Sequence, residues 1–275
     1  MKQRKSEMDN IYSVEYQLNK MNEYTDVLTA YTNELYRRSD KNKLNNFAEM
    51  RKFSREIIDD CGIFYIGSEA EMLLPNYLDK VGELGVISNT NNKPIFSNRY
   101  VIPIKNMQGK ILGLVGYSKE AAERYIYCTS KYYRRRETMW GLENLELAWD
   151  MGYAIVTEGI TDAIRIRSQG HPNTFAMCGT HKSDFIMKQL NRCKNGVIKI
   201  PDRDAPGRKA SARWECNRSI TLNTFIQYKD ADEMCRDSDE MKELFEEYLS
   251  DCINWILSGE HKGFKCENIS VTIGS

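Results

Sequence analysis

The stretch GYAIVTEGITDAIRIRSQG, residues 152–170, sets the fold of this 275-residue chain. Its apolar run ends at Glu158, a glycine follows, and a helical pattern containing Asp162 comes next. A third strand-like piece at 173–178 and a helical segment at 181–194 continue the alternation. Strand and helix alternating at this spacing predict an α/β fold, in which a parallel sheet is built with right-handed crossovers.

A second stretch, GVIKIPDRDAPGRKASARWE at residues 196–215, shows the same pattern of an apolar run that ends at acidic residues and is followed by a helical pattern. Its apolar run ends in an Asp-Arg-Asp triplet, and a fourth run at 221–228 leads into Lys-Asp-Ala-Asp. The ends of parallel strands gather at one edge of the sheet, where ligands bind. The sequence therefore predicts that five acidic side chains converge there: Glu158, Asp202, Asp204, Asp230 and Asp232. Carboxylates this close need cations, and Mg²⁺ or Mn²⁺ are the natural neutralisers.

The charge of the chain is balanced overall but uneven along its length. Lys plus Arg and Asp plus Glu both number 39. Between residues 99 and 136 there are nine basic and two acidic side chains, whereas residues 230–251 hold ten acidic and two basic ones. A basic block ahead of an acidic edge suits a polyanion held over cations. Without the carboxylates, an ordinary solvated face would explain the block equally well.

The cysteines and the hydropathy pattern exclude several classes of protein. The eight cysteines form no CxxC pair, which argues against a zinc module or a disulfide framework and favours a reducing interior. The start, MKQRKSEMDN, is not a secretory signal. No apolar run is long enough to span a bilayer, so we expect a soluble protein without membrane partners.

Outside the alternating region, the pattern predicts further elements. Residues 1–44 read as helical, because neither Gly nor Pro interrupts them. We also expect short helices within 47–78, a hairpin formed by 99–104 and 110–117, a helix at 144–151, a charged helix at 239–257 and a short β-like tail.

The acidic motifs resemble a known fold. Glu158-Gly159 with Asp162 resembles the EGxxD motif of the TOPRIM fold, and Asp202-Arg203-Asp204 resembles its DxD motif. The order of the surrounding motifs is similar to that of bacterial DNA primases of the DnaG type. The segment 53–65 resembles their LSxEVIxxFxIGF, 99–113 their RIMFPI…GxxIGF hairpin, 124–125 and 140–142 their KYLNS and LYGL pieces, 202–208 DGDxAGR, and 229–233 KDPDE. The likeness runs from about residue 22 to 240.

This resemblance implies an α+β amino-terminal subdomain followed by a TOPRIM domain of βαβαβα type with a mostly parallel sheet and a carboxy-terminal helix. The domains it implies are a helical extension (1–21), the primase-core subdomain with the basic face (22–148), the TOPRIM domain (149–234) and a helical segment with a tail (235–275).

The activity implied by the resemblance is synthesis of short RNA primers on single-stranded DNA from ribonucleoside triphosphates. Metal ions neutralise phosphate charge in such a transfer. Because Mg²⁺ takes few protein carboxylates, Glu158, Asp202 and Asp204 are expected as the catalytic core ligands. Asp230 and Asp232 are expected as outer or second-metal ligands. Asp162 is either an orienting residue behind them or simply a favourable acid in the first turn of a helix.

The resemblance also places cations for template or nucleotide phosphates, which such cations bind without reading sequence. The expected residues are Arg99, Arg124, Arg135, Arg208 and Lys209. Tyrosines in the same block, such as Tyr125 and Tyr132, could stack on bases or simply pack.

The chain departs from the family pattern in informative ways. Arg203 replaces the glycine of DGD, and in an extended segment it should face away from the metals. No stretch of this sequence resembles the family's amino-terminal zinc module or its full helicase-binding bundle, so we expect a stand-alone core without zinc, of the kind found in bacteriophages. A replicative helicase and a separate template-recognition factor are the expected partners, and the bacterial cytoplasm is the expected location.

Two other functions remain open from the sequence. A TOPRIM nuclease uses the same carboxylates to cleave DNA, but the hairpin and basic block that precede the TOPRIM motifs fit primases better. A non-catalytic scaffold that binds single-stranded DNA is the second alternative, and the presence of all the key acids argues against it.

Overall fold

The computed structural model describes residues 2–179, 183–204, 214, 216–258 and 269–272. The helices are α1 (Lys2–Arg38), α2 (Lys41–Arg51), α3 (Arg55–Asp60), α4 (Glu69–Met72), α5 (Leu145–Met151), α6 (Ile160–Ser168), α7 (Asp184–Leu190), α9 (Ala231–Asp237) and α10 (Asp239–Ser258), with short 3₁₀ turns at Pro75–Tyr77, Arg135–Glu137 and Leu142–Asn144. The strands are β1 (Phe64–Ile66), β2 (Arg99–Lys105), β3 (Ile111–Tyr117), β4 (Tyr125–Tyr127), β5 (Tyr153–Thr157), β6 (Thr174–Ala176), β7 (Gly196–Ile200), β8 (Ser219–Leu222) and β9 (Ile269–Thr272).

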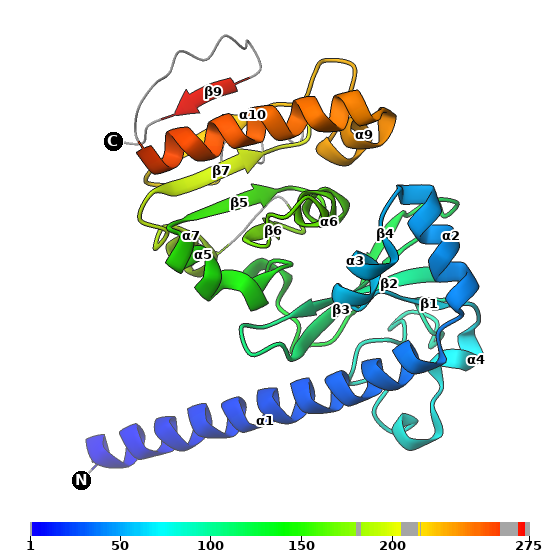
Figure 1. The fold of residues 1–275 in the computed structure, drawn as a ribbon. Coiled ribbons are helices and arrows are strands. Elements are labelled where there is room, and N and C mark those ends of the chain that lie inside the picture. Colours follow the sequence, from blue (N-terminus) through cyan, green and yellow to red (C-terminus); the bar gives the residue numbers. More distant parts are fainter. Residues whose placement is uncertain (1, 180–182, 205–213, 215, 259–268, 273–275) are drawn as a thin grey trace. The chain divides into compact units, whose positions relative to one another are not determined.

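The chain divides into two compact units, each assembled from several segments. Unit 1 comprises residues 1–44, 62–103 and 109–133, and unit 2 comprises residues 45–61, 104–108 and 134–275. Each unit has its own sheet: the first has the strand order β1-β2-β3-β4, and the second β6-β5-β7-β8-β9 (Figure 1).

In unit 1 the long helix α1 packs on the antiparallel strands. The pairs β1–β2 and β3–β4 are antiparallel. Leu28 and Tyr31 of α1 are fully buried. The Tyr24 hydroxyl donates to the Leu112 carbonyl at 3.1 Å, and the Thr29 hydroxyl accepts from the Ile111 amide at 2.9 Å. These bonds join the helix to β3, so the helix is part of the folded unit from about its middle onward.

Unit 2 contains the predicted parallel sheet. Strands β6, β5, β7 and β8 run parallel, and β5 pairs with β7 over its whole length, from Tyr153 opposite Gly196 to Thr157 opposite Ile200. Every residue of β5 and β7 is buried. Apolar strands buried on both faces are typical of parallel sheets covered by helices. The predicted α/β class, with a mostly parallel sheet, is confirmed.

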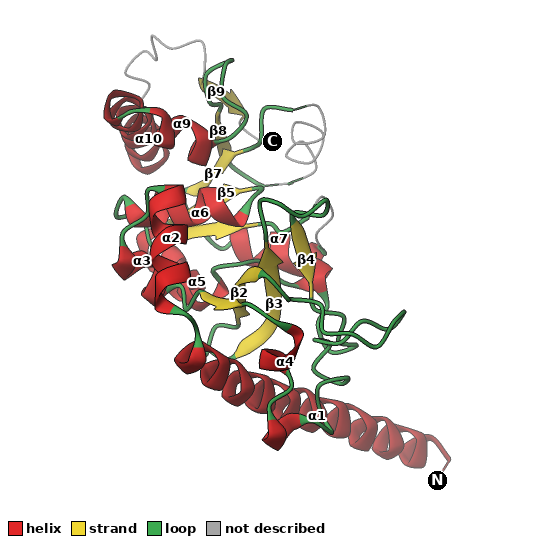
Figure 2. Cartoon of the chain, turned by 90° about the vertical axis from the view of Figure 1, so that its right-hand side faces the viewer, coloured by secondary structure: helices red, strands yellow, loops and turns green. Residues whose placement is uncertain are grey.

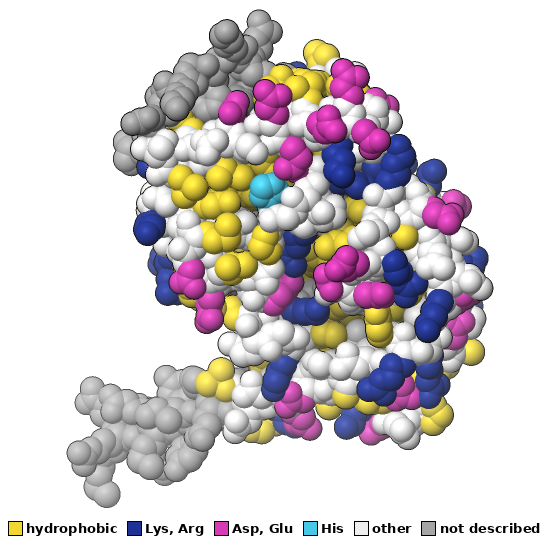
Figure 3. Space-filling view, viewed as in Figure 1, with side chains coloured by type: hydrophobic (Ala, Val, Ile, Leu, Met, Phe, Trp, Pro, Cys, Tyr) yellow, Lys and Arg dark blue, Asp and Glu magenta, His cyan; other side chains and the backbone are white. Residues whose placement is uncertain are grey.

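Helices α6, α9 and α10 share one core with the sheet of unit 2. Ile166 of α6, Met234 of α9 and Trp255 of α10 belong to a single buried cluster with Ile198 and Ile220 of the strands. Figure 1 shows α10 running alongside the sheet, between β7 and β9 in this view. Its outer side carries a row of acidic side chains (Figure 3), which accounts for the part of the acidic stretch that begins at Asp239.

The structure also corrects the predicted elements in detail. The hairpin is confirmed as β2 and β3, and the helix at 144–151 as α5. The fourth strand is displaced: β8 occupies Ser219–Leu222, ends well before Tyr228, and is followed by a loop. The short tail forms β9, which pairs antiparallel with β8 at the edge of the sheet (Figure 2). Within the described residues, no helix combines the length and apolarity required to cross a bilayer.

Candidate active site

Glu158 directly follows β5, at the carboxyl end of a central strand. Its Oε2 atom is buried and accepts no hydrogen bond from the described residues. Burial, together with the charges of Asp202 and Asp204, raises the pKa of Glu158 to about 7. Glu158 follows β5 and the two aspartates follow β7, so all three acids lie at the carboxyl ends of adjacent parallel strands, which is the arrangement expected from the sequence.

Asp202 and Asp204 follow β7, the neighbouring strand. The ammonium group of Lys229 lies 3.1 Å from an Asp202 carboxylate oxygen and 3.9 Å from one of Asp204. Burial raises the pKa of Asp202, and Lys229 opposes that rise. The backbone amide of Arg203 donates to the Lys229 carbonyl at 2.7 Å, which fixes the two loops side by side. Asp202 and Asp204 thus share one cation that the chain itself supplies.

Asp162 lies in the first turn of α6 and is only 4% exposed. Its Oδ1 atom accepts the backbone amide of Asp232 at 2.9 Å. Burial is the main cause that raises its pKa well above the usual range, and the charges of Asp230 and Asp202 add to it. A Cβ atom at Gly159 would come within 2.5 Å of the Asp162 Oδ2 atom. The glycine of the EGxxD motif therefore makes room for the buried carboxylate.

Asp230 and Asp232 occupy the start of α9 and have different partners. Asp230 is the N-cap of the helix, and its side chain accepts the Glu233 amide at 2.8 Å. Asp232 is 1% exposed, and arginine side chains donate to both of its carboxylate oxygens. The predicted delivery of these two acids by a strand end is wrong, because α9, not β8, positions them.

The donors near Glu158 fit a hard divalent cation. The ligand atoms that these acids offer are carboxylate oxygens, which Mg²⁺ and Mn²⁺ prefer. In addition, the Glu158 Oε2 atom is buried and accepts no hydrogen bond from the described residues. However, the described residues contain no set of three or more His, Cys, Asp or Glu side chains already arranged to hold a metal ion. The five carboxylates are therefore not one ready-made set of ligands, and Asp232 in particular has arginines as its partners.

Two of the predicted phosphate-binding arginines belong to unit 1. The Arg99 guanidinium donates to the carbonyls of Glu123 and Arg124 at 2.9 and 3.2 Å, so part of its donor capacity holds the loop before β4. Arg124 is exposed at that same loop. Of the nearby tyrosines, Tyr133 is buried against Gly113, where a Cβ atom would lie 2.5 Å from its ring, so this side chain packs in the core.

Arg135 belongs to unit 2 and contacts the turn that follows β6. Its guanidinium donates to the carbonyl of Cys178. Cys178 and Gly179 have φ values of 53° and 144°, and the Cys178 amide donates to the Glu158 carbonyl at 3.3 Å. The arginine therefore steadies the backbone beside Glu158. Arg203 donates to the Thr224 carbonyl. The predicted phosphate-binding residues Arg208 and Lys209 lie outside the described residues.

Sequence reasoning missed Lys229 as the partner of the aspartates and missed the arginines around Asp232. Lys229 is the first residue of the KDPDE-like motif, so the sequence located it near the acids. The sequence did not show that its side chain points toward Asp202 and Asp204. Arg51 and Arg165 lie far from Asp232 along the chain, and only the folded contacts bring them together.

The raised pKa of Glu158 predicts a pH dependence of stability. Because the folded-state pKa lies above the ordinary value of 4.5, the folded protein binds this proton more tightly than the unfolded chain. In EDTA, unfolding free energy should therefore fall as pH rises from about 4.5 to about 7. Glu158→Gln should remove this component. After allowance for solvent screening of a half-exposed group, it should raise Tm at pH 8 by roughly 2–4 °C.

Thermal unfolding followed by circular dichroism between pH 5 and 8 tests this expectation. Other acids at the site titrate in both proteins, so the difference between wild type and variant isolates Glu158. Parallel Tm profiles across this pH range would contradict it.

Comparisons with known proteins agree with these features. The Toprim-like family matches residues 155–235, which span β5 to α9. DNA primase from Thermotoga maritima is 24% identical over 229 residues, covering 77% of this chain and 40% of that protein. DNA primase from Aquifex aeolicus is 32% identical over 122 residues, covering 43% of this chain and 24% of that protein. The chain thus spans less than half the length of these curated relatives.

Solved structures share the fold. The DnaG primase catalytic domain bound to single-stranded DNA superposes with a TM-score of 0.71 at 19% identity, over 88% of this chain and 83% of that one. The E. coli primase catalytic core gives a TM-score of 0.69 at 18% identity, over 86% and 82%. Residues 155–235 are thus Toprim-like, and over most of its length the chain is similar in sequence to DNA primases and shares the fold of DnaG primase catalytic cores.

Proposed function

We propose that this chain is a primase core that joins ribonucleotides on a single-stranded DNA template. The observation that carries the proposal is the placement of Glu158 beside Asp202 and Asp204, at the carboxyl ends of two adjacent parallel strands. One of the solved structures with this fold is a primase domain bound to single-stranded DNA. Ribonucleoside triphosphates are the proposed second substrate.

The proposed ligands of Mg²⁺ or Mn²⁺ are Glu158, Asp202 and Asp204, with Asp230 next to them. When bound, the cation would supply charge neutralisation at the phosphates of the incoming nucleotide. In the proposed transfer a 3′-hydroxyl forms a bond to the α-phosphorus, the bond to pyrophosphate breaks, and pyrophosphate and the hydroxyl proton are released. The chain's own residues orient these carboxylates. Lys229 holds Asp202 and Asp204 together, and Arg135 steadies the turn beside Glu158. The buried Asp162 orients the start of α9 through the Asp232 amide.

Incubation with single-stranded DNA, labelled nucleotides and Mg²⁺ or Mn²⁺ tests the function. Appearance of short RNA supports the proposal. Shortening of the DNA would indicate a nuclease, and a shift in the electrophoretic mobility of the DNA without turnover would indicate a non-catalytic scaffold. Either result would contradict the proposed primase function. A helicase and a template-recognition factor are proposed partners, and a phage origin with action in the bacterial cytoplasm is the proposed setting.

Arg124 gives a prediction for the template interface. Removal of one phosphate-binding cation weakens binding to all sequences and lowers the salt slope of log K by about 1. Arg124→Ala should therefore reduce affinity for single-stranded DNA about 3- to 10-fold at low salt, a size based on that loss of one ionic contact. Fluorescence anisotropy at several salt concentrations measures it.

The matched control is Arg192→Ala, which removes an arginine that rests on the Trp149 ring, 3.4 Å from its centroid. This control should leave the salt slope unchanged. An equal change in both variants would argue against a specific role for Arg124.

A further inference from the structure

Asp232 is the centre of a buried cluster of ion pairs. Its Oδ1 atom accepts from Arg165 Nε at 3.1 Å and from Arg165 Nη2 at 3.0 Å. Its Oδ2 atom accepts from Arg51 at 2.6 Å and from Arg236 at 2.9 Å. The side chains of Asp232 and Arg165 are 1% and 4% exposed. Four charge-assisted hydrogen bonds thus converge on one carboxylate, and all its residues belong to unit 2.

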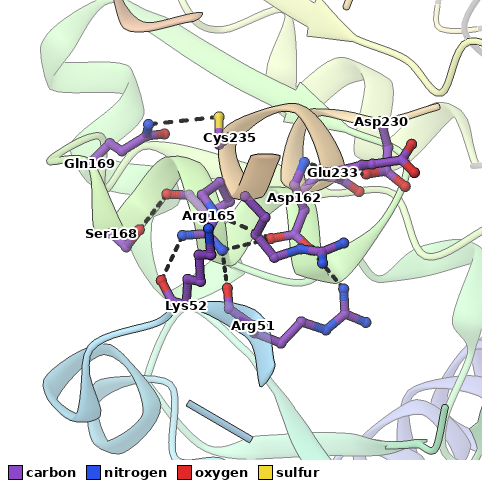
Figure 4. Close-up of polar contacts among 11 residues, drawn as sticks. Arg51, Lys52, Asp162, Arg165, Ser168, Gln169, Asp230, Glu233 and Cys235 are labelled. Carbon is purple, nitrogen blue, oxygen red and sulfur yellow. Dashed lines mark hydrogen bonds and ion pairs between the residues drawn. The ribbon is translucent and has the colours of Figure 1, made fainter. Parts of the chain in front are cut away.

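Arg165 extends the cluster to the end of α2. Its Nη1 atom donates to the Lys52 carbonyl at 2.9 Å, and its Nη2 atom donates to the Arg51 carbonyl (Figure 4). Its guanidinium also lies over the Phe53 ring, 4.4 Å from the centroid. Lys52 has a φ of 50°, so the chain leaves the helix there in a left-handed conformation. Arg165 therefore satisfies backbone acceptors that the end of the helix exposes.

The same cluster is continuous with the acidic edge. The Asp232 amide donates to Asp162 Oδ1, and Asp230 caps α9 two residues earlier. Figure 4 shows Asp162 and Asp230 next to the arginine network. The position of the first turn of α9, and with it that of Asp230, therefore depends on what holds Asp232.

These contacts are incompatible with the metal-ligand role that the resemblance implies for Asp232. Arginine donors already occupy both carboxylate oxygens, so binding a cation through either oxygen would require the loss of at least one of these hydrogen bonds. Coordination through Oδ1 would deprive the buried Arg165 side chain of its only described carboxylate partner. An uncompensated buried charge is strongly destabilising.

We propose that Asp232 and Arg165 are positioning residues: their ion pair joins the end of α2 to α6 and α9 and holds Asp162 and Asp230 in place at the acidic edge. The predicted change in metal affinity rests on the proposed function, whereas the structural role of the ion pair does not depend on it. The experiment separates the two by measuring stability without metal and Mn²⁺ affinity.

The full-length chain is compared with Asp232→Asn, Arg165→Met, the double variant and Arg167→Met. Arg167 is the matched control, since it lies on the same helix and is similarly buried, but it binds Glu143 and the Thr174 carbonyl. Thermal unfolding in EDTA reports on the ion pair. Paramagnetic resonance of free Mn²⁺, recorded at a temperature where each protein is folded, reports on affinity.

Each single variant at the ion pair should lower Tm in EDTA, and the double variant should lower it little further, because the partners act as one unit. Mn²⁺ affinity should fall about 10-fold in Asp232→Asn and in Arg165→Met, as for residues that orient ligands. Arg167→Met should lower Tm but leave Mn²⁺ affinity within about twofold, since it removes only a structural contact. If Arg165→Met does not fold, Arg165→Lys takes its place. Lysine keeps the charge but loses the paired donors of the guanidinium, so both Tm in EDTA and Mn²⁺ affinity should again fall.

Loss of Mn²⁺ binding in Asp232→Asn alone, with Arg165→Met unchanged, would make Asp232 a ligand and overturn the proposal. So would unchanged affinity in both, or an equal loss in Arg167→Met. If the wild-type protein binds no Mn²⁺, the proposed function fails, and additive Tm losses in EDTA would then overturn the ion-pair role independently.

Discussion

Replacing both Asp202 and Asp204 by Asn should abolish primer synthesis, with a loss of at least about 10³-fold in rate. The physical reason is that two anionic oxygen donors become weak neutral ones, and cation stabilisation of the transferring phosphate supplies several kcal/mol. Asn keeps the volume of Asp, and Lys229 is 56% exposed, so solvent can replace its lost partners. Binding of single-stranded DNA should stay within about threefold, because phosphate contacts by cations dominate that affinity. Single-turnover synthesis and fluorescence anisotropy measure the two quantities.

A charge-matched control separates the site from net charge. Glu247→Gln with Asp251→Asn removes the same two negative charges from α10, far along the chain from the strand ends. This control should retain synthesis. Synthesis that persists in the Asp202/Asp204 variant would remove the assignment of these residues as metal ligands.

Gly159→Ala is the second substitution with a large expected effect. A Cβ atom there would lie 2.5 Å from Asp162 Oδ2, although φ of −90° is ordinary for alanine. Asp162 is buried and bonded to the Asp232 amide, so its carboxylate has little freedom to move away. A displacement of about 1 Å at a catalytic site can cost roughly 100-fold in rate. We expect a fall of that order in kcat with little change in KM for nucleotides.

The clean control for this substitution is Gly82→Ala, where an added Cβ atom meets nothing within 4 Å. Steady-state kinetics measure kcat and KM for both variants, and Tm shows whether each variant is folded. If Gly159→Ala retains wild-type kcat, then the close contact with Asp162 does not position the acidic edge.

The sheet of unit 2 was predictable because its signal is local. Buried parallel strands read as short apolar runs, and each run here ends at an acid or leads into a helix. Glu158, Asp202 and Asp204 then follow from topology, since the carboxyl ends of adjacent parallel strands share an edge. The hairpin of β2 and β3 was marked by its Gly-containing turn.

The surroundings of Asp232 were not predictable, because they depend on long-range contacts. Arg51 precedes Asp232 by 181 residues and Arg165 by 67. Nothing in the local pattern distinguishes these buried arginines from solvated ones. The apolar run at 221–228 led to a wrong strand assignment, because β8 starts earlier and ends at Leu222. Asp230 is a helix cap and does not lie at a strand end. Residue type therefore identified the acids, whereas tertiary packing determined that Asp232 is paired with arginines and that Asp202 is paired with Lys229.

The most direct test of the central claim is anomalous diffraction from crystals of this chain soaked in Mn²⁺. The account predicts a peak coordinated by Glu158 together with Asp202 or Asp204, with Asp232 still bound to its arginines. A peak held by Asp232, or Mn²⁺ bound without Glu158 and the Asp202/Asp204 pair, would contradict it.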